Sequence, residues 1–291
     1  MPETVLVVLP SPTVADAPAD PVRADPAVPL LRVDDLGVSR GDGIFETVNA
    51  VGGHPQALGA HLARFARSAA MLDLPTPAAE VWRRAVHEAV AAHPPVPELL
   101  VKLVMTRGVE GSGRCSGWVL AFPNADATRV RTEGVAVLTL ARGYPADVMT
   151  TAPWLLQGAK TLSYALNMAA LRHARTKGAD DAIFVSSEGE VLEAPTSSVV
   201  AQFGDRLVTP PCDLGILEGT CQGRVFAWAR GRGLATAVER LTVDDLHRAG
   251  SLWLCSSGRL ATPVRELDGV PRTWDAALHT EVLAHLLTVH E

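Results

Sequence analysis

The chain has 291 residues, of which 47% are hydrophobic and 20% charged, so it can bury a substantial core and is not expected to be disordered. Its formal net charge of -6, with a pI near 5.9 and no run of Lys or Arg, argues against a nucleic-acid-binding surface. No apolar run approaches the length of a membrane span and the first residues do not resemble a signal peptide, so we expect a soluble cytoplasmic protein.

The first half of the chain predicts short strands and two helices. A strand near its start is followed by a Pro/Ala/Asp-rich segment, residues 11–29, that we expect to be an irregular loop. Apolar residues at helical spacing predict two helices, each ended by proline. In chain order, the expected elements are a strand at 4–9, two strands joined by a Gly-Gly hairpin at 43–58, helices at 59–74 and 78–93, and strands at 98–108, 117–123 and 135–142.

The second half begins with a connecting segment at 142–157 and a helix over about 161–177. Hairpin-linked strands then alternate irregularly with short helices, which favours an α+β fold over a regular βαβ array. We expect a small N-terminal domain at 1–143, a linker at 144–154 and a larger domain at 155–291. The other elements expected in the larger domain are strands at 181–187, 191–203, 206–210, 236–241 and 251–257, helices beginning near Thr220 and Thr242, and a terminal helix.

Lysine is rare in this chain, which has 26 Lys+Arg but only three lysines, Lys102, Lys160 and Lys177. Lys102 lies in a strand pattern on the face opposite Leu103 and Met105, where we expect it to be solvated. Lys177 stands just before a glycine at the end of a predicted helix, where a cation is ordinary. Lys160 has no such explanation, because it precedes a predicted helix whose dipole disfavours a cation at that end.

Two interpretations of Lys160 remain open from its local sequence. Either its stem packs at a domain seam while the amine reaches water, or the amine acts as a Schiff-base nucleophile in partly apolar surroundings. Three other stretches favour the second interpretation. Glu193 precedes three hydroxyl residues and could pair with a protonated ring nitrogen. The glycine turn at 215–220 opens a helix whose N–H groups suit a phosphate, and Ser256 and Ser257 end a buried strand with two more hydroxyls.

The cysteines and histidines suggest no competing site. The four cysteines lie far apart without CxxC spacing, and the nine histidines show no HExxH pairing. Neither a disulfide framework nor a bound metal is expected.

Six segments, taken in order, resemble those of fold-type IV pyridoxal-phosphate (PLP) enzymes. This family includes branched-chain aminotransferases, D-amino-acid aminotransferases and aminodeoxychorismate lyases. The matches cover about residues 35–75 and 155–270, and they are most similar to actinobacterial members classed as aminodeoxychorismate lyases or class IV aminotransferases. The resemblance implies a two-domain α+β fold, with a small N-terminal α/β domain and a β-barrel-like core in the larger domain. The segments are RGDGIFETV, HLARFARSA, AKTLSYALNMAALRHARTKGADDAIFVSSEGEVLEAPTSSVV, VTPP, GILEGT and SSGRLATPVRELDG.

The resemblance also implies a PLP cofactor and a role for each matching residue. Lys160 would link covalently to PLP and act as the catalytic base, while Glu193 would face the pyridine nitrogen. Cys221 stands where many members have a threonine, and its thiol is a weaker donor to the phosphate. Ser198 stands where an asparagine is common, and APT at 194–196 replaces a Gly-rich turn; these two departures weaken the transfer of substrate specificity. The other implied contacts are Arg64, Gly219, Thr220, Cys221 and Ser257 at the phosphate, Leu217 on the ring face, Tyr164 near the ring hydroxyl, and Arg107 and Ser256 toward the substrate. Arg259 is unusual beside the second phosphate loop, and two interpretations of it are open: contact with substrate or with solvent only.

From the resemblance we expect an aminodeoxychorismate lyase, which converts 4-amino-4-deoxychorismate to 4-aminobenzoate and pyruvate in folate biosynthesis. One alternative is an aminotransferase that acts on D-amino acids or branched-chain amino acids, and another is a PLP-binding protein without turnover. The implied partner is a small-molecule amine or amino acid rather than a nucleic acid or a membrane. Members of the family are dimeric with the active site near the subunit interface, so a homodimer is implied as well.

Overall fold

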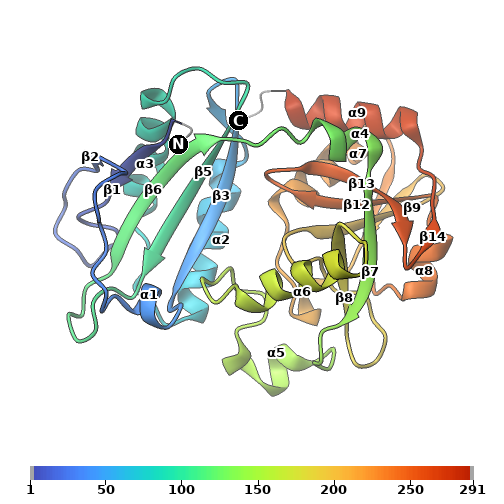
Figure 1. Cartoon of the computed structure of the whole chain (residues 1–291), viewed down its shortest axis with the longest axis horizontal. Helices are drawn as coiled ribbons and strands as arrows, with labels where there is room; N and C mark the ends of the chain where they lie inside the picture. Colours follow the sequence, from blue (N-terminus) through green and yellow to red (C-terminus); the bar gives the residue numbers. More distant parts are fainter. Residues whose placement is uncertain (1–2, 289–291) are drawn as a thin grey trace. The chain divides into compact units, whose positions relative to one another are not determined.

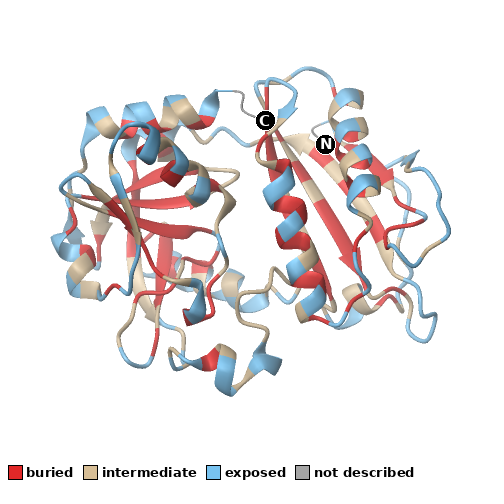
Figure 2. Ribbon diagram, turned by 180° about the vertical axis from the view of Figure 1, so that it is seen from behind, coloured by how far each residue is buried: buried red, intermediate tan, exposed pale blue. Residues whose placement is uncertain are grey.

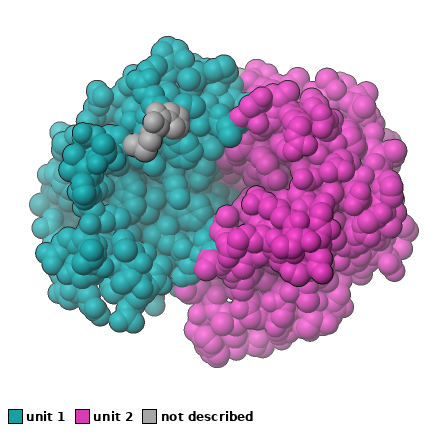
Figure 3. Space-filling model, viewed as in Figure 1, with its two compact units in different colours: residues 1–125, 159–164, 289–291 teal, residues 126–158, 165–288 magenta. Residues whose placement is uncertain are grey.

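The computed structural model describes residues 3–288, and these residues form two compact units. Unit 1 contains the described residues up to Ala125 together with Ala159–Tyr164, and unit 2 contains Asp126–Gly158 and Ala165–Thr288 (Figure 3). The chain therefore leaves unit 1, returns to it with a short segment that includes Lys160, and then completes unit 2.

Unit 1 is an antiparallel sheet with the strand order β2-β1-β6-β5-β3-β4 and helices on one face (Figure 1). Alternation of side chains along the strands produces the two faces. On β3, Ile44, Glu46 and Val48 are fully buried, whereas Phe45 and Thr47 on the other face are half-buried. The bounds are β1 Val5–Val8, β2 Val22–Ala24, β3 Gly43–Val51, β4 His54–Pro55, β5 Glu98–Thr106 and β6 Ser116–Pro123.

Two amphipathic helices, α2 and α3, cover the buried face of this sheet, as the views from both sides agree (Figures 1 and 2). Their contact includes an edge-to-face pair of the Phe65 and Trp82 rings, whose centroids are 4.8 Å apart. Both rings are fully buried, so they contribute strongly to the core of unit 1. The helices of this unit are α1 Leu36–Ser39, α2 Leu58–Met71 and α3 Ala79–Ala92.

Unit 2 is built on a curled sheet with the order β11-β10-β9-β12-β13-β7-β8, and β14 pairs with β13. Neighbouring residues of one strand point into different core clusters, because side chains alternate between the faces. Val199 on β9 and Leu252 on β12 belong to one cluster, whereas the next residue of each strand, Val200 and Trp253, packs with helices α7 and α9 in another. The strands are β7 Val135–Ala141, β8 Asp181–Val185, β9 Ser198–Phe203, β10 Arg206–Thr209, β11 Ala235–Val238, β12 Ser251–Ser256, β13 Leu260–Leu267 and β14 Val270–Pro271.

Two helices of unit 2, α8 and α9, begin at residues whose side chains cap the helix. The α8 helix has a capping box, in which the Thr242 side chain accepts from the backbone N–H of Asp245 while the Asp245 carboxylate accepts from the backbone N–H of Thr242. Within residues 3–288, no helix is both long and apolar enough to cross a membrane. The helices are α4 Thr128–Glu133, α5 Val148–Thr151, α6 Ala165–Thr176, α7 Thr220–Gly231, α8 Val243–Arg248 and α9 Ala276–Leu287, with 3-10 turns at Pro153–Leu155 and Cys212–Leu214.

The α+β class is confirmed, but the division into units differs from the one expected. We expected the first domain to end at residue 143, before a linker at 144–154. In the structure, β7 pairs in parallel with β13 and β8, so residues 126–143 belong to unit 2. Conversely, Ala159–Tyr164 belongs to unit 1. Pairing between strands that are far apart in sequence cannot be recognised from the residues around each strand, so the sequence did not indicate this boundary.

Three local expectations also need correction. Residues 11–29 are not wholly irregular, because β2 within them pairs with β1. The strand expected at 191–203 begins only at Ser198, because Ala194 and Ser197 first close a turn through their backbones. The helix expected from about residue 161 begins at Ala165.

Candidate active site

Lys160 lies in an extended segment that runs along the start of β3. Its carbonyl oxygen accepts from the backbone N–H of Phe45 at 3.0 Å, and its own N–H donates to Ser68 Oγ at 3.0 Å. Because α6 begins at Ala165, Lys160 is not at a helix start, and our argument from an unfavourable helix dipole is wrong. The segment is held instead by β3 and by α2.

The Lys160 amine lies over aromatic rings. Its Nζ is 4.5 Å from the centroid of the Phe45 ring and 6.0 Å from that of Tyr164. The two rings themselves meet edge to face, with centroids 5.3 Å apart. Unit 1 therefore brings Lys160 and Tyr164 together, and Phe45 sets the direction of the amine through a cation–π contact.

A buried charged group lies between β3 and α2, close to Lys160. The Glu46 carboxylate accepts from Arg64 Nε and Nη2, both at 2.7 Å, and its Oε2 is 2.7 Å from His61 Nδ1. His61 and Arg64 are three residues apart on α2, so both project from one face of the helix. All three side chains are buried, which fixes the Arg64 guanidinium in position.

The two titratable partners of this group have shifted pKa values. Burial alone raises the pKa of Glu46, but the charge and hydrogen bonds of Arg64, with a smaller effect from His61, outweigh it and hold the pKa well below its usual range. Burial lowers the pKa of His61, and the charges of Arg64 and Lys160 lower it further against the opposing effect of Glu46. The group therefore contains an ionised glutamate, an arginine and a neutral histidine.

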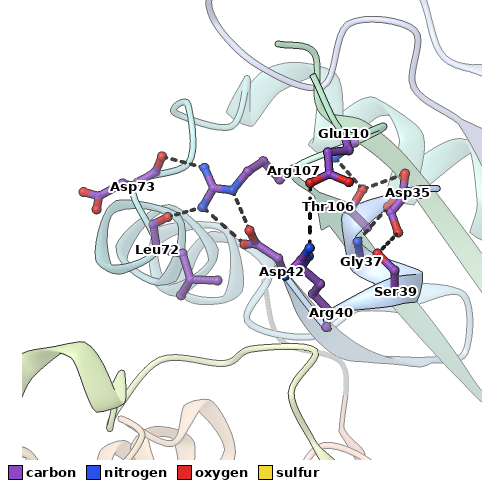
Figure 4. Close-up of polar contacts among 12 residues, drawn as sticks. Asp35, Gly37, Ser39, Arg40, Asp42, Leu72, Asp73, Thr106, Arg107 and Glu110 are labelled. Carbon is purple, nitrogen blue, oxygen red and sulfur yellow. Dashed lines mark hydrogen bonds and ion pairs between the residues drawn. The ribbon is translucent and has the colours of Figure 1, made fainter. Parts of the chain in front are cut away.

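Arg107 connects three segments of unit 1 (Figure 4). Its Nε donates to Asp42 Oδ2 at 2.6 Å, and its Nη2 donates to the Leu72 carbonyl oxygen at 2.6 Å. A third contact joins Nη1 to the carbonyl oxygen of Asp73 at 3.2 Å. These bonds attach the end of β5 to the end of α2 and to the loop before β3. They give Arg107 a structural function, and its contact with substrate stays a prediction.

In unit 2, two residues expected at the cofactor ring are directly connected. The Glu193 carboxylate accepts from the backbone N–H of Leu217 at 3.2 Å. The main chain of Glu193 is fixed as well, because its carbonyl oxygen accepts from the N–H of Phe184 on β8 at 2.9 Å. The structure thus brings Glu193 and Leu217 together and orients the carboxylate.

The start of α7 also has the geometry of an anion site. Gly219 caps the helix without a side-chain hydrogen bond, and the first N–H groups of any helix lack intrahelical acceptors. A Cβ on Gly219 would lie only 2.2 Å from Ser198 Oγ, so a larger residue there would force Ser198 to move. Ser198, Gly219 and the backbone of Thr220 are therefore neighbours. This placement suits a phosphate bound by backbone N–H groups.

Cys221 directs its side chain away from this helix start. It is buried in the same apolar cluster as Cys255. The neighbouring Cys221 thiol, together with burial, raises the pKa of Cys255 well above its ordinary value. Any phosphate contact at Cys221 would thus involve its backbone rather than the thiol.

Arg259 is held inside unit 2 rather than exposed to solvent. Its Nη2 donates to the carboxylate of Asp181, which is fully buried, and to Ser197 Oγ at 3.0 Å. Ser256 Oγ accepts from the Arg259 N–H at 3.3 Å, at the turn that also contains Ser257. Arg259 therefore ties this turn to the hydroxyl residues after Glu193, and its expected contact with substrate stays a prediction.

Sequence reasoning missed Glu46, His61, Ser68 and Asp181 as parts of these arrangements. Three of them carry a signal that could have been found. Glu46 alternates with Ile44 and Val48 in a strand pattern, which places a carboxylate on the buried face. His61 and Ser68 lie on the same helical face as Arg64, at spacings of three and four residues. A carboxylate and a cation both assigned to buried faces predict a buried ion pair.

Residues 43–267 match the family model described as amino-transferase class IV. The chain is 43% identical over 270 residues to the bifunctional aminodeoxychorismate lyase / D-amino acid transaminase of Mycobacterium tuberculosis, covering 89% of this chain and 93% of that protein.

Two solved structures match almost the full length of this chain. One is the fold IV transaminase CpuTA1 from Curtobacterium pusillum, with 48% identity and a TM-score of 0.94 over 98% of this chain and 97% of that one. The other is a hypothetical aminotransferase from Mycobacterium tuberculosis in its PLP-bound form, with 40% identity and a TM-score of 0.89 over 98% and 97% of the two chains.

Proposed function

Because the chain belongs to the class IV aminotransferase family, whose cofactor is PLP, we propose that it is an aminodeoxychorismate lyase. It would convert 4-amino-4-deoxychorismate to 4-aminobenzoate and pyruvate. The observation that carries the catalytic assignment is the Lys160 amine, 4.5 Å from the Phe45 ring, with its backbone fixed by Ser68. The choice of reaction is supported by the 43% identity to a bifunctional protein of that name.

The residues present fit PLP. Gly219 has the close backbone approach that a phosphate at a helix start requires. The Glu193 carboxylate is held by the Leu217 N–H, which supports its assignment as the partner of a pyridinium nitrogen. We assign the phosphate to Arg64, to the backbone N–H groups at Thr220 and Cys221, and to Ser257. Leu217 would pack on the ring face, and Tyr164 would lie near the ring hydroxyl.

When bound, PLP supplies an electron sink for negative charge that develops at the reacting carbon of the substrate. The chain's own residues hold and move the proton. Lys160 Nζ removes it from the reacting carbon, and the Phe45 and Tyr164 rings keep the amine aimed. In the lyase reaction, the bond between the ring carbon and the enolpyruvyl oxygen then breaks. The departing enolpyruvate takes up a proton from Lys160 or water to become pyruvate, and the aromatic product remains.

A second candidate is an aminotransferase that acts on D-amino acids, and it uses the same residues. Lys160 would return the proton to a different carbon, so the product would be a keto acid instead. This alternative is supported by the 48% identity to a transaminase and by the bifunctional name of the Mycobacterium protein. Branched-chain amino acids are a further substrate class within it. A PLP-binding protein without turnover is disfavoured, because Lys160 and Glu193 are both present.

The test is to incubate the purified PLP-loaded protein with 4-amino-4-deoxychorismate and to quantify 4-aminobenzoate and pyruvate. Equal amounts of both products are expected, and Lys160→Ala should give neither. A parallel reaction with D-alanine and 2-oxoglutarate measures transamination. If only the second reaction proceeds at high enzyme concentration, the lyase proposal fails and the aminotransferase remains.

We further propose that the chain forms a homodimer. On strands β5 and β6, the open face of the sheet in unit 1 carries four half-buried apolar side chains, a composition that suits contact with another protein surface. A monomeric mass by light scattering at micromolar concentration would contradict this. The four residues are Leu100, Trp118, Leu120 and Phe122.

A further inference from the structure

Buried cations also occur outside the arrangements described above. Lys102 on β5 is half-buried, and its Nζ lies 5.0 Å from the centroid of the Phe45 ring, so the expectation that it is solvated is wrong. Arg131 on α4 is only 6% exposed. Whereas Lys102 contacts an aromatic ring, Arg131 contacts the main chain of the turn at residues 257–259, between β12 and β13.

The Arg131 guanidinium holds two successive carbonyl groups of this turn. Its Nη2 donates to the Gly258 carbonyl oxygen at 2.9 Å, and its Nε donates to the Arg259 carbonyl oxygen at 3.1 Å. Because a peptide group is planar and its N–H points away from its carbonyl oxygen, each bond also fixes the direction of an N–H group. The N–H of Arg259, in the first of these peptide groups, donates to Ser256 Oγ at 3.3 Å. One planar cation therefore sets the backbone orientation of the turn from one side.

Arg131 is itself fixed by a buried chain of hydrogen bonds. Trp253 Nε1 donates to His279 Nδ1 at 3.2 Å, and His279 Nε2 lies 2.6 Å from the Arg131 carbonyl oxygen. An indole N–H only donates, so Nδ1 accepts and Nε2 carries the proton that it donates to Arg131. Burial lowers the pKa of His279 against the opposing effect of its bond to Arg131, in agreement with the neutral ring that this pattern requires. The strand β12 and the helices α9 and α4 thus hold the arginine against the turn that follows β12.

The turn lies next to the start of α7, where we place the phosphate. Cys255, near the end of β12, is paired with Ser198 of β9 in the strand register, and neighbouring strands lie about 5 Å apart. A Cβ on Gly219 would lie 2.2 Å from Ser198 Oγ, so Gly219 packs directly on that side chain. The end of β12 and the start of α7 therefore meet at Ser198, which places both within reach of one small anion.

The charge of Arg131 also acts at the start of α7. The neighbouring Cys255 thiol has the largest effect in lowering the pKa of Cys221, and the charges of Arg224 and Arg131 lower it further against the effect of burial. Cys221 is the second residue of α7, beside the N–H groups assigned to the phosphate. Charges that favour a negative group at this position also attract an anion bound at the same helix start.

We propose that Arg131 is a positioning residue for the cofactor phosphate: it holds the turn at residues 257–259 so that Ser257 meets the anion bound at the start of α7. Arg131 acts through the turn, because its Nε and Nη2 are engaged by carbonyl groups of the turn. The inference rests on the proposed function only in its assignment of Ser257 and the start of α7 to the phosphate. It is independent of the reaction that Lys160 catalyses.

The test compares Arg131→Met, which removes the charge and both donors, with Arg131→Lys, which keeps the charge without the paired donors. Arg129→Met, at an exposed position on the same helix, is the matched control. Pyridoxamine phosphate and pyridoxamine are titrated by calorimetry into the full-length protein freed of PLP, because neither links covalently to Lys160 and only the first carries a phosphate. Arg131→Met should weaken binding of pyridoxamine phosphate about tenfold, as expected for a lost hydrogen bond to a charged group. Binding of pyridoxamine should change less than about threefold, and Arg131→Lys should give a smaller loss that is also confined to the phosphorylated ligand.

The phosphorus NMR resonance of PLP in the loaded enzyme is a second readout, which a purely structural role of Arg131 would not move. It should shift in both Arg131 variants and stay unchanged in Arg129→Met. If Arg131→Met does not fold, Arg131→Lys decides alone, and an unchanged affinity and resonance in that variant would overturn the inference. Equal losses for the two ligands would also overturn it, because they would mean that Arg131 only stabilises unit 2.

Ser257→Ala separates this inference from the assignment on which it rests. A loss confined to pyridoxamine phosphate is expected in this variant too. Such a loss in Ser257→Ala, with none in the Arg131 variants, would overturn the inference and leave the phosphate assignment standing. No such loss in any of the three variants would overturn the assignment of this turn to the phosphate together with the inference.

Discussion

The two units supply their candidate site groups by different physical means. Unit 1 contributes side-chain charges: Lys160 on an aromatic ring, and Arg64 held by the buried carboxylate of Glu46. Unit 2 contributes mostly backbone groups, namely the Leu217 N–H that fixes Glu193 and the helix start at Gly219. The difference teaches that substitutions in unit 1 should act through charge, whereas those in unit 2 should act through shape.

Substitutions in these two arrangements also differ in their energetic consequences. Removing one partner of a buried ion pair leaves an uncompensated charge in a medium of low polarity, which is strongly destabilising. A site made of backbone N–H groups tolerates many side chains, because the bonding groups belong to every residue type. Such a site is disrupted only where a substitution adds an atom that overlaps a neighbouring side chain, as at Gly219.

The largest effect is expected at Lys160 in unit 1. Lys160→Ala should lower turnover of any productive substrate at least about a thousandfold, because we propose this residue as both the cofactor link and the proton carrier. The visible absorption band of the bound cofactor that borohydride bleaches should disappear with it. Persistence of a bleachable band in the variant would refute the assignment of Lys160.

The second largest effect is expected at the buried ion pair of Glu46 and Arg64, which tests the charge-based arrangement in unit 1. Glu46→Gln should destabilise the protein by about 3–5 kcal/mol and weaken PLP binding, because Arg64 loses its counter-charge. Urea unfolding and PLP titration measure the two effects. Glu80→Gln is the control, since its exposed pair with Arg83 should contribute less than about 1 kcal/mol. Similar losses in both variants would remove the distinction between buried and exposed charge.

The next effect in size is expected at the start of α7, which tests the shape-based arrangement in unit 2. Gly219→Ala should cost about 1–3 kcal/mol of stability and reduce PLP affinity, because the new Cβ overlaps Ser198 Oγ. Gly223→Ala in the same helix is the matched control. Its Cβ would have open space, so it should stabilise the protein by about 0.5–1 kcal/mol. Adding Ser198→Gly to Gly219→Ala should restore part of the loss, and failure to do so would contradict a steric cause.

The smallest effect expected is a pH dependence from His61. Its pKa is lowered in the folded state, so the unfolded chain binds more protons as the pH falls below the ordinary histidine value near 6.5. Its contribution to stability is therefore complete above that value and is lost at lower pH. His61→Gln should reduce the fall in unfolding free energy between pH 7.5 and 5.5 by about 1 kcal/mol, measured by urea unfolding. His87→Gln, at an exposed position, should leave that fall unchanged.

Much of the fold follows from local signals in the sequence. The hairpin at Gly52 and Gly53 was predicted because both residues supply the left-handed backbone of a tight turn, with φ of 56° and 84°. The helices α2, α3 and α7 and the strands β5, β6 and β12 occur where periodicity placed them. The boundary between units was not predictable in this way, because β7 is assigned to unit 2 by pairing with β13.

The candidate site was likewise predictable only in part from the sequence. Lys160 stood out because its residue type is rare in this chain, yet the reason first given for it, a helix start, was wrong. Its neighbours Phe45 and Ser68 come from a strand and a helix about a hundred residues earlier, and no spacing in the sequence connects them to it. Arg107 was predicted from the family resemblance and Arg259 from its position beside the second phosphate loop, and the structure adds the internal acceptors that hold each of them.

By itself, the sequence determined the element types, the α+β class and the family, because periodicity, turn residues and ordered motifs are local properties of a chain. Only the tertiary structure decided that Lys160 returns to unit 1, that Glu46 neutralises Arg64, and that Phe45 lies under two lysines. Each of these depends on contacts between residues distant in sequence. Burial then turns such contacts into strong constraints, because a charge removed from water must find its partner nearby.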